Sequence, residues 1–69
     1  MWIEWLDGFR IFVDAGCGEV KISANREGLL SLGLQLVALA EGMPGDHIHY
    51  DEHNSLEAGS SDMIIERIG

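Results

Sequence analysis

The sequence predicts an α+β fold, a two-layer sandwich in the order β-β-β-α-β-β. Short segments of alternating apolar and polar residues lie before residue 25 and after residue 45, and one leucine-rich run at helical spacing lies between them. Gly, Asn and Pro separate these segments. We expect one mainly antiparallel five-stranded sheet with a single helix on one face. The length of 69 residues predicts a single α+β domain over residues 1–69.

The first part of the chain is predicted to form three strands joined by two tight turns. We expect the strands over residues 1–6, 9–14 and 19–23. Asp7 and Gly8 favour a hairpin turn because both tolerate positive φ, and AGCG over residues 15–18 predicts the second turn. Alternation along the strands predicts these inward-facing residues: Phe9, Ile11, Val13, Val20 and Ile22.

A helix is predicted over residues 26–41. Asn25 is expected to be its N-cap, and Gly42, followed by Pro44, its left-handed C′ residue. Its apolar residues spread over about 220°, whereas one sheet covers a stripe nearer 100–140°. The remaining arc holds Glu27, Ser31, Gln35 and Ala38. Loops or another subunit must therefore cover the surplus, and Gly33 within the apolar arc permits close backbone approach.

Two further strands are predicted over residues 46–51 and 63–68, with a polar loop over residues 52–61 between them. Ile48 and Tyr50 share one face of the first of these strands. The last strand has apolar residues on both faces, which is typical of an inner strand or an oligomer contact. The loop is longer than an ordinary hairpin connection and is therefore a candidate functional loop.

Charge indicates the class of partner. Twelve acidic residues face four basic ones, for a net charge of −8. Nucleic acid and anionic membranes demand cationic surface and are not expected as partners. A basic protein fits better, because the field would steer it in, although acidity also simply keeps a small protein soluble. We expect partner contacts from three acids of the loop region: Asp51, Glu52 and Glu57.

Location and self-association are predicted from other features. The single cysteine, Cys17, cannot form an intrachain disulfide, and no signal peptide or membrane span is evident, so we expect a cytoplasmic protein. The wide apolar arc of the helix predicts a homodimer. Trp2 and Trp5 point to opposite faces of the first predicted strand, so one of them is a candidate interface residue.

The histidines raise the alternative of a metal site. His47, His49, Asp51 and His53 recur at every second position, which on a strand places them on one face about 6.6 Å apart per step. Imidazole and carboxylate ligands in such a row can chelate zinc. The competing interpretation is a polar outer face of the sheet, and this is the one we favour, with no resident metal or cofactor. No nucleophile lies beside an activating base, so no catalytic residues are predicted and an enzyme is not expected.

Four segments carry a family resemblance: ISANREGLLSL at the helix start, HIHYDE on a strand, NSLEAGS in the loop and the terminal MIIERI. Together they resemble a small α+β family of immunity proteins from bacterial polymorphic toxin systems, over residues 22–68. The resemblance implies a non-enzymatic protein that binds a cognate toxin and blocks it, with a nuclease as one toxin class. The alternative function is a small metal-binding protein or metal-dependent enzyme that uses the histidine cluster.

Overall fold

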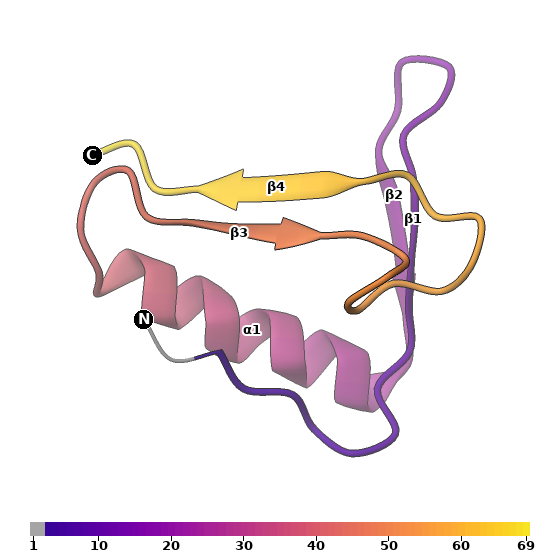
Figure 1. Ribbon diagram of the computed structural model, residues 1–69, viewed down its shortest axis with the longest axis horizontal. Helices are drawn as coiled ribbons and strands as arrows, with labels where there is room; N and C mark the ends of the chain where they lie inside the picture. Colours follow the sequence, from indigo (N-terminus) through magenta and orange to yellow (C-terminus); the bar gives the residue numbers. More distant parts are fainter. Residues whose placement is uncertain (1–2) are drawn as a thin grey trace.

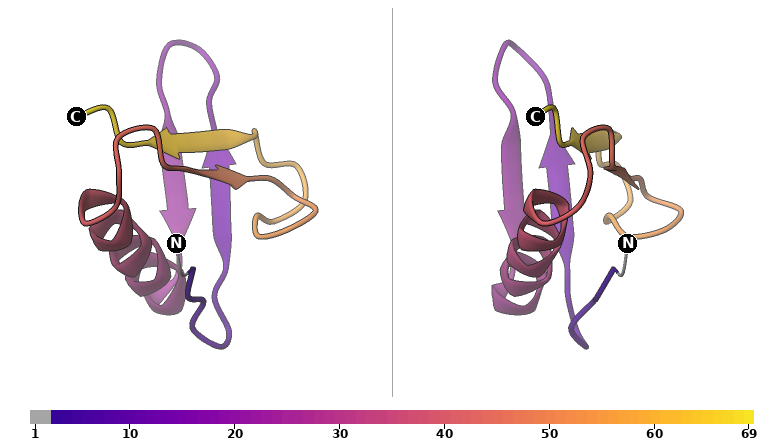
Figure 2. Two further views of the ribbon diagram at one scale, coloured as in Figure 1. Left: turned by 60° about the vertical axis from the view of Figure 1, so that its left-hand side comes forward. Right: turned by 90° about the vertical axis from the view of Figure 1, so that its left-hand side faces the viewer.

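Two antiparallel hairpins and one helix make up residues 3–69, the part of the chain that this computed structural model describes (Figure 1). The elements are β1 (Ile11–Asp14), β2 (Lys21–Ala24), α1 (Arg26–Ala40), β3 (His47–Tyr50) and β4 (Met63–Glu66). β1 pairs with β2 and β3 with β4, as two separate sheets that cross one another (Figures 1 and 2). The predicted α+β class is confirmed, whereas the single five-stranded sheet of the predicted sandwich is wrong.

The first predicted strand does not form in the described residues. Residues 3–10 contain no strand, although the predicted turn is present: Gly8 has a φ of 81° and the Phe9 N–H donates to the Leu6 carbonyl at 3.1 Å. The chain therefore turns here without making a hairpin. Residues 1 and 2, and with them Trp2, lie outside the described residues.

Side chains of α1 take the place of a neighbouring strand along this N-terminal segment. The Leu6 N–H donates to Ser31 Oγ at 2.9 Å, and Gln35 Nε2 donates to the Glu4 carbonyl at 2.8 Å. These bonds satisfy backbone groups that a β-ladder would otherwise satisfy. The segment consequently runs as an extended strap along the helix instead of pairing with β1.

The β1–β2 hairpin forms as predicted at its turn. The Glu19 N–H donates to the Gly16 carbonyl at 3.1 Å, and the two central residues, Cys17 and Gly18, have φ values of 55° and 80°. Positive φ at both central positions matches the twist that a two-residue hairpin requires. Cys17 is exposed at this tip, which projects beyond the rest of the fold (Figure 1).

β1 contributes two buried residues to the core, whereas β2 contributes the partly buried Ala24. Ile11 and Val13 are 0% and 1% exposed, as predicted. The prediction that Val20 and Ile22 face inward is wrong, because these side chains are 69% and 42% exposed. β2 lies at the edge of its two-stranded sheet, and Val20 lies between the projecting turn and β2, so nothing in the described chain covers it.

α1 begins at the predicted cap. Asn25 Oδ1 accepts hydrogen bonds from the Gly28 and Arg10 N–H groups, both at 2.9 Å. Asn25 Nδ2 donates to the Gly8 carbonyl at 2.7 Å. One side chain thus caps the helix and fixes the chain that leads into β1.

The end of α1 differs from the prediction. Gly42 is not in the left-handed region; the glycine with positive φ is Gly45, at 95°. Gly42 has another role, because a Cβ there would clash with the carboxylate of Asp46. That carboxylate accepts the Met43 N–H at 2.9 Å and so fixes the turn into β3.

The two faces of α1 agree only in part with what its sequence pattern predicts. The buried residues are Gly28, Ser31, Leu32, Gln35 and Leu39. The large apolar residues left exposed are Leu29, Leu30, Leu34, Leu36 and Val37. Part of the polar arc therefore faces the core, whereas most of the leucines face outward. Gly33 lies on the exposed side, where glycine costs the helix about 1 kcal/mol relative to alanine.

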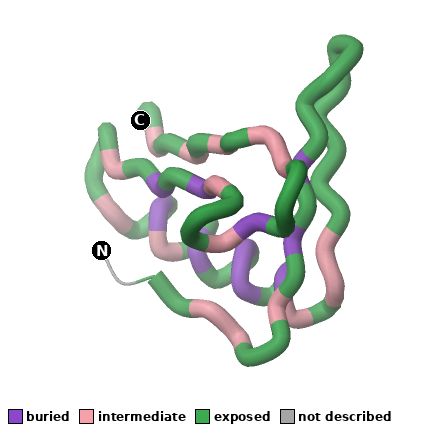
Figure 3. The backbone as a smooth tube through the Cα atoms, turned by 45° about the vertical axis from the view of Figure 1, so that its right-hand side comes forward, coloured by how far each residue is buried: buried purple, intermediate pink, exposed green. Residues whose placement is uncertain are grey.

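The core lies where α1, β1, β3 and the loop after β3 meet, and the β1–β2 tip lies outside it (Figure 3). Its buried hydrophobic residues are Ile11, Val13, Leu32, Leu39, Ile48, Tyr50 and Leu56. Trp5 stacks on Phe9 with ring centroids 4.5 Å apart and meets Tyr50 edge-on at 6.1 Å. The N-terminal strap thereby closes the core with aromatic rings.

The β3–β4 hairpin packs one face only. Ile48 and Tyr50 are buried as predicted, and Met63 and Ile65 of β4 pack partly buried against the core. Ile64 and Ile68 are 59% and 91% exposed, so the prediction of an inner strand is wrong. β4 is instead an edge strand whose outer face carries apolar residues.

Candidate functional site

The loop that follows β3 is shaped by Asp51. Its Oδ1 accepts the His53 and Asn54 N–H groups at 2.8 and 3.0 Å, and its carbonyl accepts the Leu56 N–H at 2.8 Å. An aspartate that bonds to backbone N–H groups two and three residues later is a common turn former. The long predicted loop is present, and its first half is a folded turn.

The second half of the loop is attached to β1. The Glu57 N–H donates to the Ile11 carbonyl at 2.8 Å, and the Ser61 N–H donates to the Val13 carbonyl at 2.7 Å. Leu56, 5% exposed, inserts into the core between these bonds and the turn. The loop therefore covers the free edge of β1 and is held in one conformation, which lowers the entropy cost of binding through it.

The three predicted partner-binding acids have different surroundings. The Asp51 carboxylate is engaged in the turn and half-buried. Glu52 is exposed, with Oε2 accepting the Gly59 N–H at 2.9 Å. Glu57 is exposed, and its carboxylate has no intramolecular hydrogen bond or ion pair within residues 3–69. Of the three carboxylates, that of Glu57 is therefore the one most available to bond to a partner.

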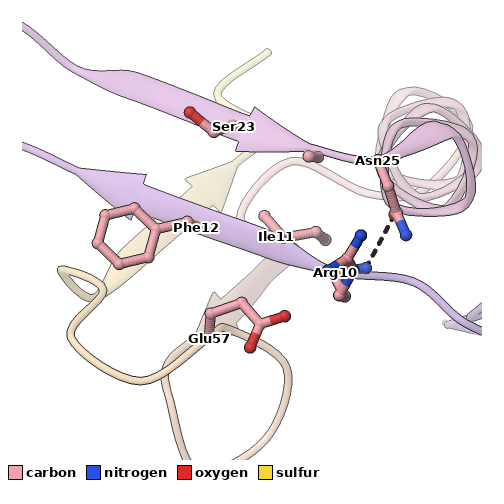
Figure 4. A pocket seen from close by; sticks show the side chains of 7 residues that line it. Arg10, Ile11, Phe12, Ser23, Asn25 and Glu57 are labelled. Atoms are coloured by element: carbon pink, nitrogen blue, oxygen red, sulfur yellow. Dashed lines mark hydrogen bonds between the residues drawn. The ribbon is translucent and has the colours of Figure 1, made fainter.

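Glu57 borders an open depression of about 560 Å³ beside β1 (Figure 4). Arg10, Phe12 and Asn25 also line it, and the close-up shows Glu57 reaching in from the loop while Phe12 and Arg10 come from the β1 side. A second depression, of about 280 Å³, is lined by Glu57, Glu52 and Phe9 among others. Glu57 therefore borders both hollows, and the exposed acidic loop residues that line them, Glu52 and Glu57, are called the ridge.

Arg10 and Phe12 line the candidate site, and the sequence prediction did not include them. Alternation along the strand indicated that both point away from the core, and Phe12 is 37% exposed. An exposed phenylalanine that alternates with buried residues is a signal for a binding surface. The charged residues that line this hollow are one basic residue, Arg10, and one acidic residue, Glu57.

The acidic charge is spread over the surface and is little neutralised. None of the acidic residues in the described chain is buried. The ion pair found among residues 3–69 joins Arg26 to Glu27 at 3.6 Å, with both side chains solvent-accessible. Net charge of −8 thus acts on approaching molecules without local compensation.

The predicted metal row is broken after its second member. His47 and His49 project from the outer face of β3, with ring centroids 5.1 Å apart. β3 ends at Tyr50, however, and Asp51 and His53 enter the turn. Within residues 3–69, no group of three or more histidine, cysteine or acidic side chains is placed to hold a metal ion. The expected row of four ligands on one strand face is therefore wrong.

A buried polar pair lies behind the loop. The Tyr50 hydroxyl donates to Gln35 Oε1 at 2.7 Å, and both side chains are 1% exposed. Burial raises the pKa of Tyr50 to about 12. This pair fixes β3 to α1 and is structural, because it is closed to solvent.

None of the helices in the described residues has the length and apolarity to span a bilayer.

A comparison with protein families decides the broader assignment. A model of the family described as immunity protein 32 matches residues 19–68. The chain belongs to this family. The matched region contains β2, α1, β3, the loop and β4, and the predicted resemblance to immunity proteins is confirmed. Searches among curated proteins and among solved structures gave no significant match.

Membership supports a toxin-inhibiting role for this immunity protein. Immunity families act in general by binding and not by catalysis. The family assignment does not point to individual contact residues, so the loop ridge is the candidate surface on the strength of its geometry and charge.

Proposed function

We propose that this immunity protein is a non-enzymatic inhibitor that binds a cognate bacterial toxin through an acidic surface that includes Asp51, Glu52 and Glu57. The observation that carries the proposal is the family match together with a net charge of −8. A toxin with a basic surface would be attracted over several ångströms before contact. Toxins that degrade nucleic acid need such a surface to hold their substrate, so a nuclease is the toxin class that fits best.

The three acids would divide the work. Asp51 holds the turn in shape through its bonds to His53 and Asn54. Glu57, and to a lesser extent Glu52, present exposed carboxylates on the ridge. Phe12 in the adjoining hollow would add an apolar contact near the charged residues Arg10 and Glu57, and aromatic residues are enriched at protein interfaces.

We also propose that neither nucleic acid nor anionic lipid is a partner, and that the protein acts in the cytoplasm. A surface of this sign repels nucleic acid and anionic lipid, so neither is a partner. Free Cys17 is exposed and stays reduced most readily in the cytoplasm, where we place the protein.

The test is a kinetic measurement with the purified cognate toxin. Rim charges act mainly on the association rate. Replacing Glu52 and Glu57 by glutamine should slow association several-fold and leave the fold intact, because both side chains are exposed. The association rate of the unaltered protein should also fall steeply with salt, as the Debye length shrinks from about 10 Å at 0.1 M to about 3 Å at 1 M.

The matched control replaces Glu19 and Glu66, two other exposed acids, by glutamine. It makes the same change in net charge away from the ridge. An equal slowing by both double variants would indicate general steering without a site. Association that ignores salt and all four substitutions would refute the acidic-surface mechanism.

A further inference from the structure

The outer face of α1 is an apolar surface that nothing in the described chain covers. It consists of Leu29, Leu30, Gly33, Leu34, Leu36 and Val37. Its large side chains are between 42% exposed, at Leu30, and 57% exposed, at Leu29. Monomeric proteins rarely leave a contiguous apolar strip of this kind in water.

Gly33 lies in the middle of this outer face. No atom lies within 4 Å of the position that a Cβ would occupy there, and Gly33 does not have a positive φ. Nothing inside the chain therefore requires glycine, although glycine weakens a helix. A missing side chain at the centre of an apolar face lets a second helix approach closely, since the distance between packed helices is set by the side chains at their contact.

The charges at the two ends of the outer face indicate which helix it fits. At about 100° per residue, Arg26 and Glu41 project into the same arc as Gly33, one at each end of α1. Both are exposed. A second α1 packed antiparallel would set each Arg26 beside the Glu41 of the other copy. A parallel copy would set like charges together, and a basic toxin would find one acid and one base here.

We infer that the outer face of α1 is the interface of a homodimer in which two α1 helices pack antiparallel about a two-fold axis at Gly33. Leu29 of one copy then lies opposite Val37 of the other, and the contact is self-complementary, as a two-fold interface must be. The outer face points away from the core that Leu56 of the loop joins, so the ridge of each copy stays open. The inference does not rest on toxin inhibition.

The primary test is sedimentation equilibrium of the full chain across a micromolar concentration series. We expect the unaltered protein to approach twice the monomer mass of 7.6 kDa. Replacing Leu30 and Val37 by glutamate should leave a folded monomer, because both side chains are exposed in the single chain. The control replaces Met43 and Ile68 by glutamate; they are 70% and 91% exposed, lie outside α1, and should leave the dimer unchanged.

Charge reversal tests the antiparallel orientation. Arg26→Glu and Glu41→Arg should each weaken dimerisation, on the order of tenfold, since each exchanges two attractive pairs for two repulsive ones. The double variant should restore it, which a parallel pair would not do. Circular dichroism of each variant checks that the helix is retained.

Two results would overturn the inference. One is a monomer at every concentration; the other is a dimer that tolerates glutamate at Leu30 and Val37. If the protein is monomeric and these two substitutions abolish toxin binding, the outer face is a toxin-binding surface instead. Because mass is measured without toxin, failure of the dimer and failure of the proposed inhibition are separate outcomes.

Discussion

The two faces of α1 differ in a way that runs against their composition. The inner face buries Ser31 and Gln35 at 0% and 1% exposure, whereas the outer face leaves five large apolar residues in contact with solvent. The same 15-residue helix thus turns these two polar residues to the core, along with Leu32 and Leu39, and leaves most of its leucines in water. Hydrophobicity alone does not choose between the faces.

Directional bonds explain the choice. Ser31 donates to the Glu27 carbonyl at 2.8 Å and accepts the Leu6 N–H, and Gln35 bonds to both the strap and Tyr50. No buried side-chain nitrogen or oxygen in the described residues lacks a partner. Fully satisfied polar groups are tolerated in a core and specify one arrangement of the elements around them. Hydrogen bonds therefore determine which face of α1 lies inward, and the outer face keeps apolar surface that a partner could bury.

The largest effect is expected from breaking the inner face at Gln35. Gln35→Met keeps the side-chain length but leaves the Tyr50 hydroxyl and the Glu4 carbonyl without partners. The buried Tyr50 hydroxyl so orphaned costs about 1–3 kcal/mol, and the bond lost to the carbonyl of the exposed Glu4 adds less. We expect a total loss of about 2–3 kcal/mol in the free energy of unfolding. Urea denaturation at a concentration where the protein is monomeric measures it.

Leu34→Gln is the matched substitution on the outer face, where Leu34 is 46% exposed. It should change the stability of the monomer by no more than about 0.5 kcal/mol. The opposite ranking of the two variants would mean that the faces are assigned the wrong way round.

A smaller effect is expected at alkaline pH. The pKa of Tyr50 is raised by burial to about 12, against about 10 in an unfolded chain. The folded state therefore holds the phenol proton more tightly, so stability is complete below pH 10 and declines as pH rises toward 12. The loss should reach about 1.4 kcal/mol at pH 11.

Tyr50 is the only tyrosine in the sequence, so tyrosinate absorbance reports this group alone. Urea midpoints across the same pH range give the stability. In Tyr50→Phe the alkaline decline should be much flatter, although the variant starts from a lower stability. An absorbance midpoint near 10 in the folded protein would contradict the burial of this hydroxyl.

The smallest effects, of opposite sign, are expected when the same substitution is made on each face. In Gly28→Ala the new Cβ would lie 2.6 Å from the Arg10 carbonyl oxygen, so backbone must shift. We expect a net loss of about 1 kcal/mol, since crowding outweighs the gain in helix propensity. In Gly33→Ala the Cβ meets open space, and the monomer should gain up to about 1 kcal/mol. Thermal unfolding of both variants shows whether the signs differ.

Local signals predicted local structure. Asn25 as a cap, the alternation of Ile11 and Val13, and Ile48 and Tyr50 facing inward all follow from interactions within a few residues. The glycine-containing turn at residues 16–19 also follows from local interactions. The family resemblance rested on similarly local runs, and it was confirmed.

Two features that were not predicted from the sequence depend on hydrogen bonds between residues far apart in the chain. Residues 3–6 have the composition of a strand, but their backbone groups bond to the side chains of Ser31 and Gln35 instead of to a neighbouring strand. The same bonds turned the polar arc of α1 inward. The metal row failed because the Asp51 carboxylate was taken up by the turn. At the candidate site, the length and acidity of the loop were enough to predict it from the sequence. That Arg10 lies beside this loop could be recognised only from the depression beside β1, which both line.

Asn25 has a consequence for how the molecule opens. Its side chain binds the Gly28 and Arg10 N–H groups through one oxygen and the Gly8 carbonyl through its nitrogen. The first turn of α1 and the approach to β1 are therefore joined through one oxygen atom, Asn25 Oδ1. We expect the Gly28 and Arg10 amide protons to exchange with solvent through one cooperative event, with the helix start and the hairpin base as a single unit of local unfolding.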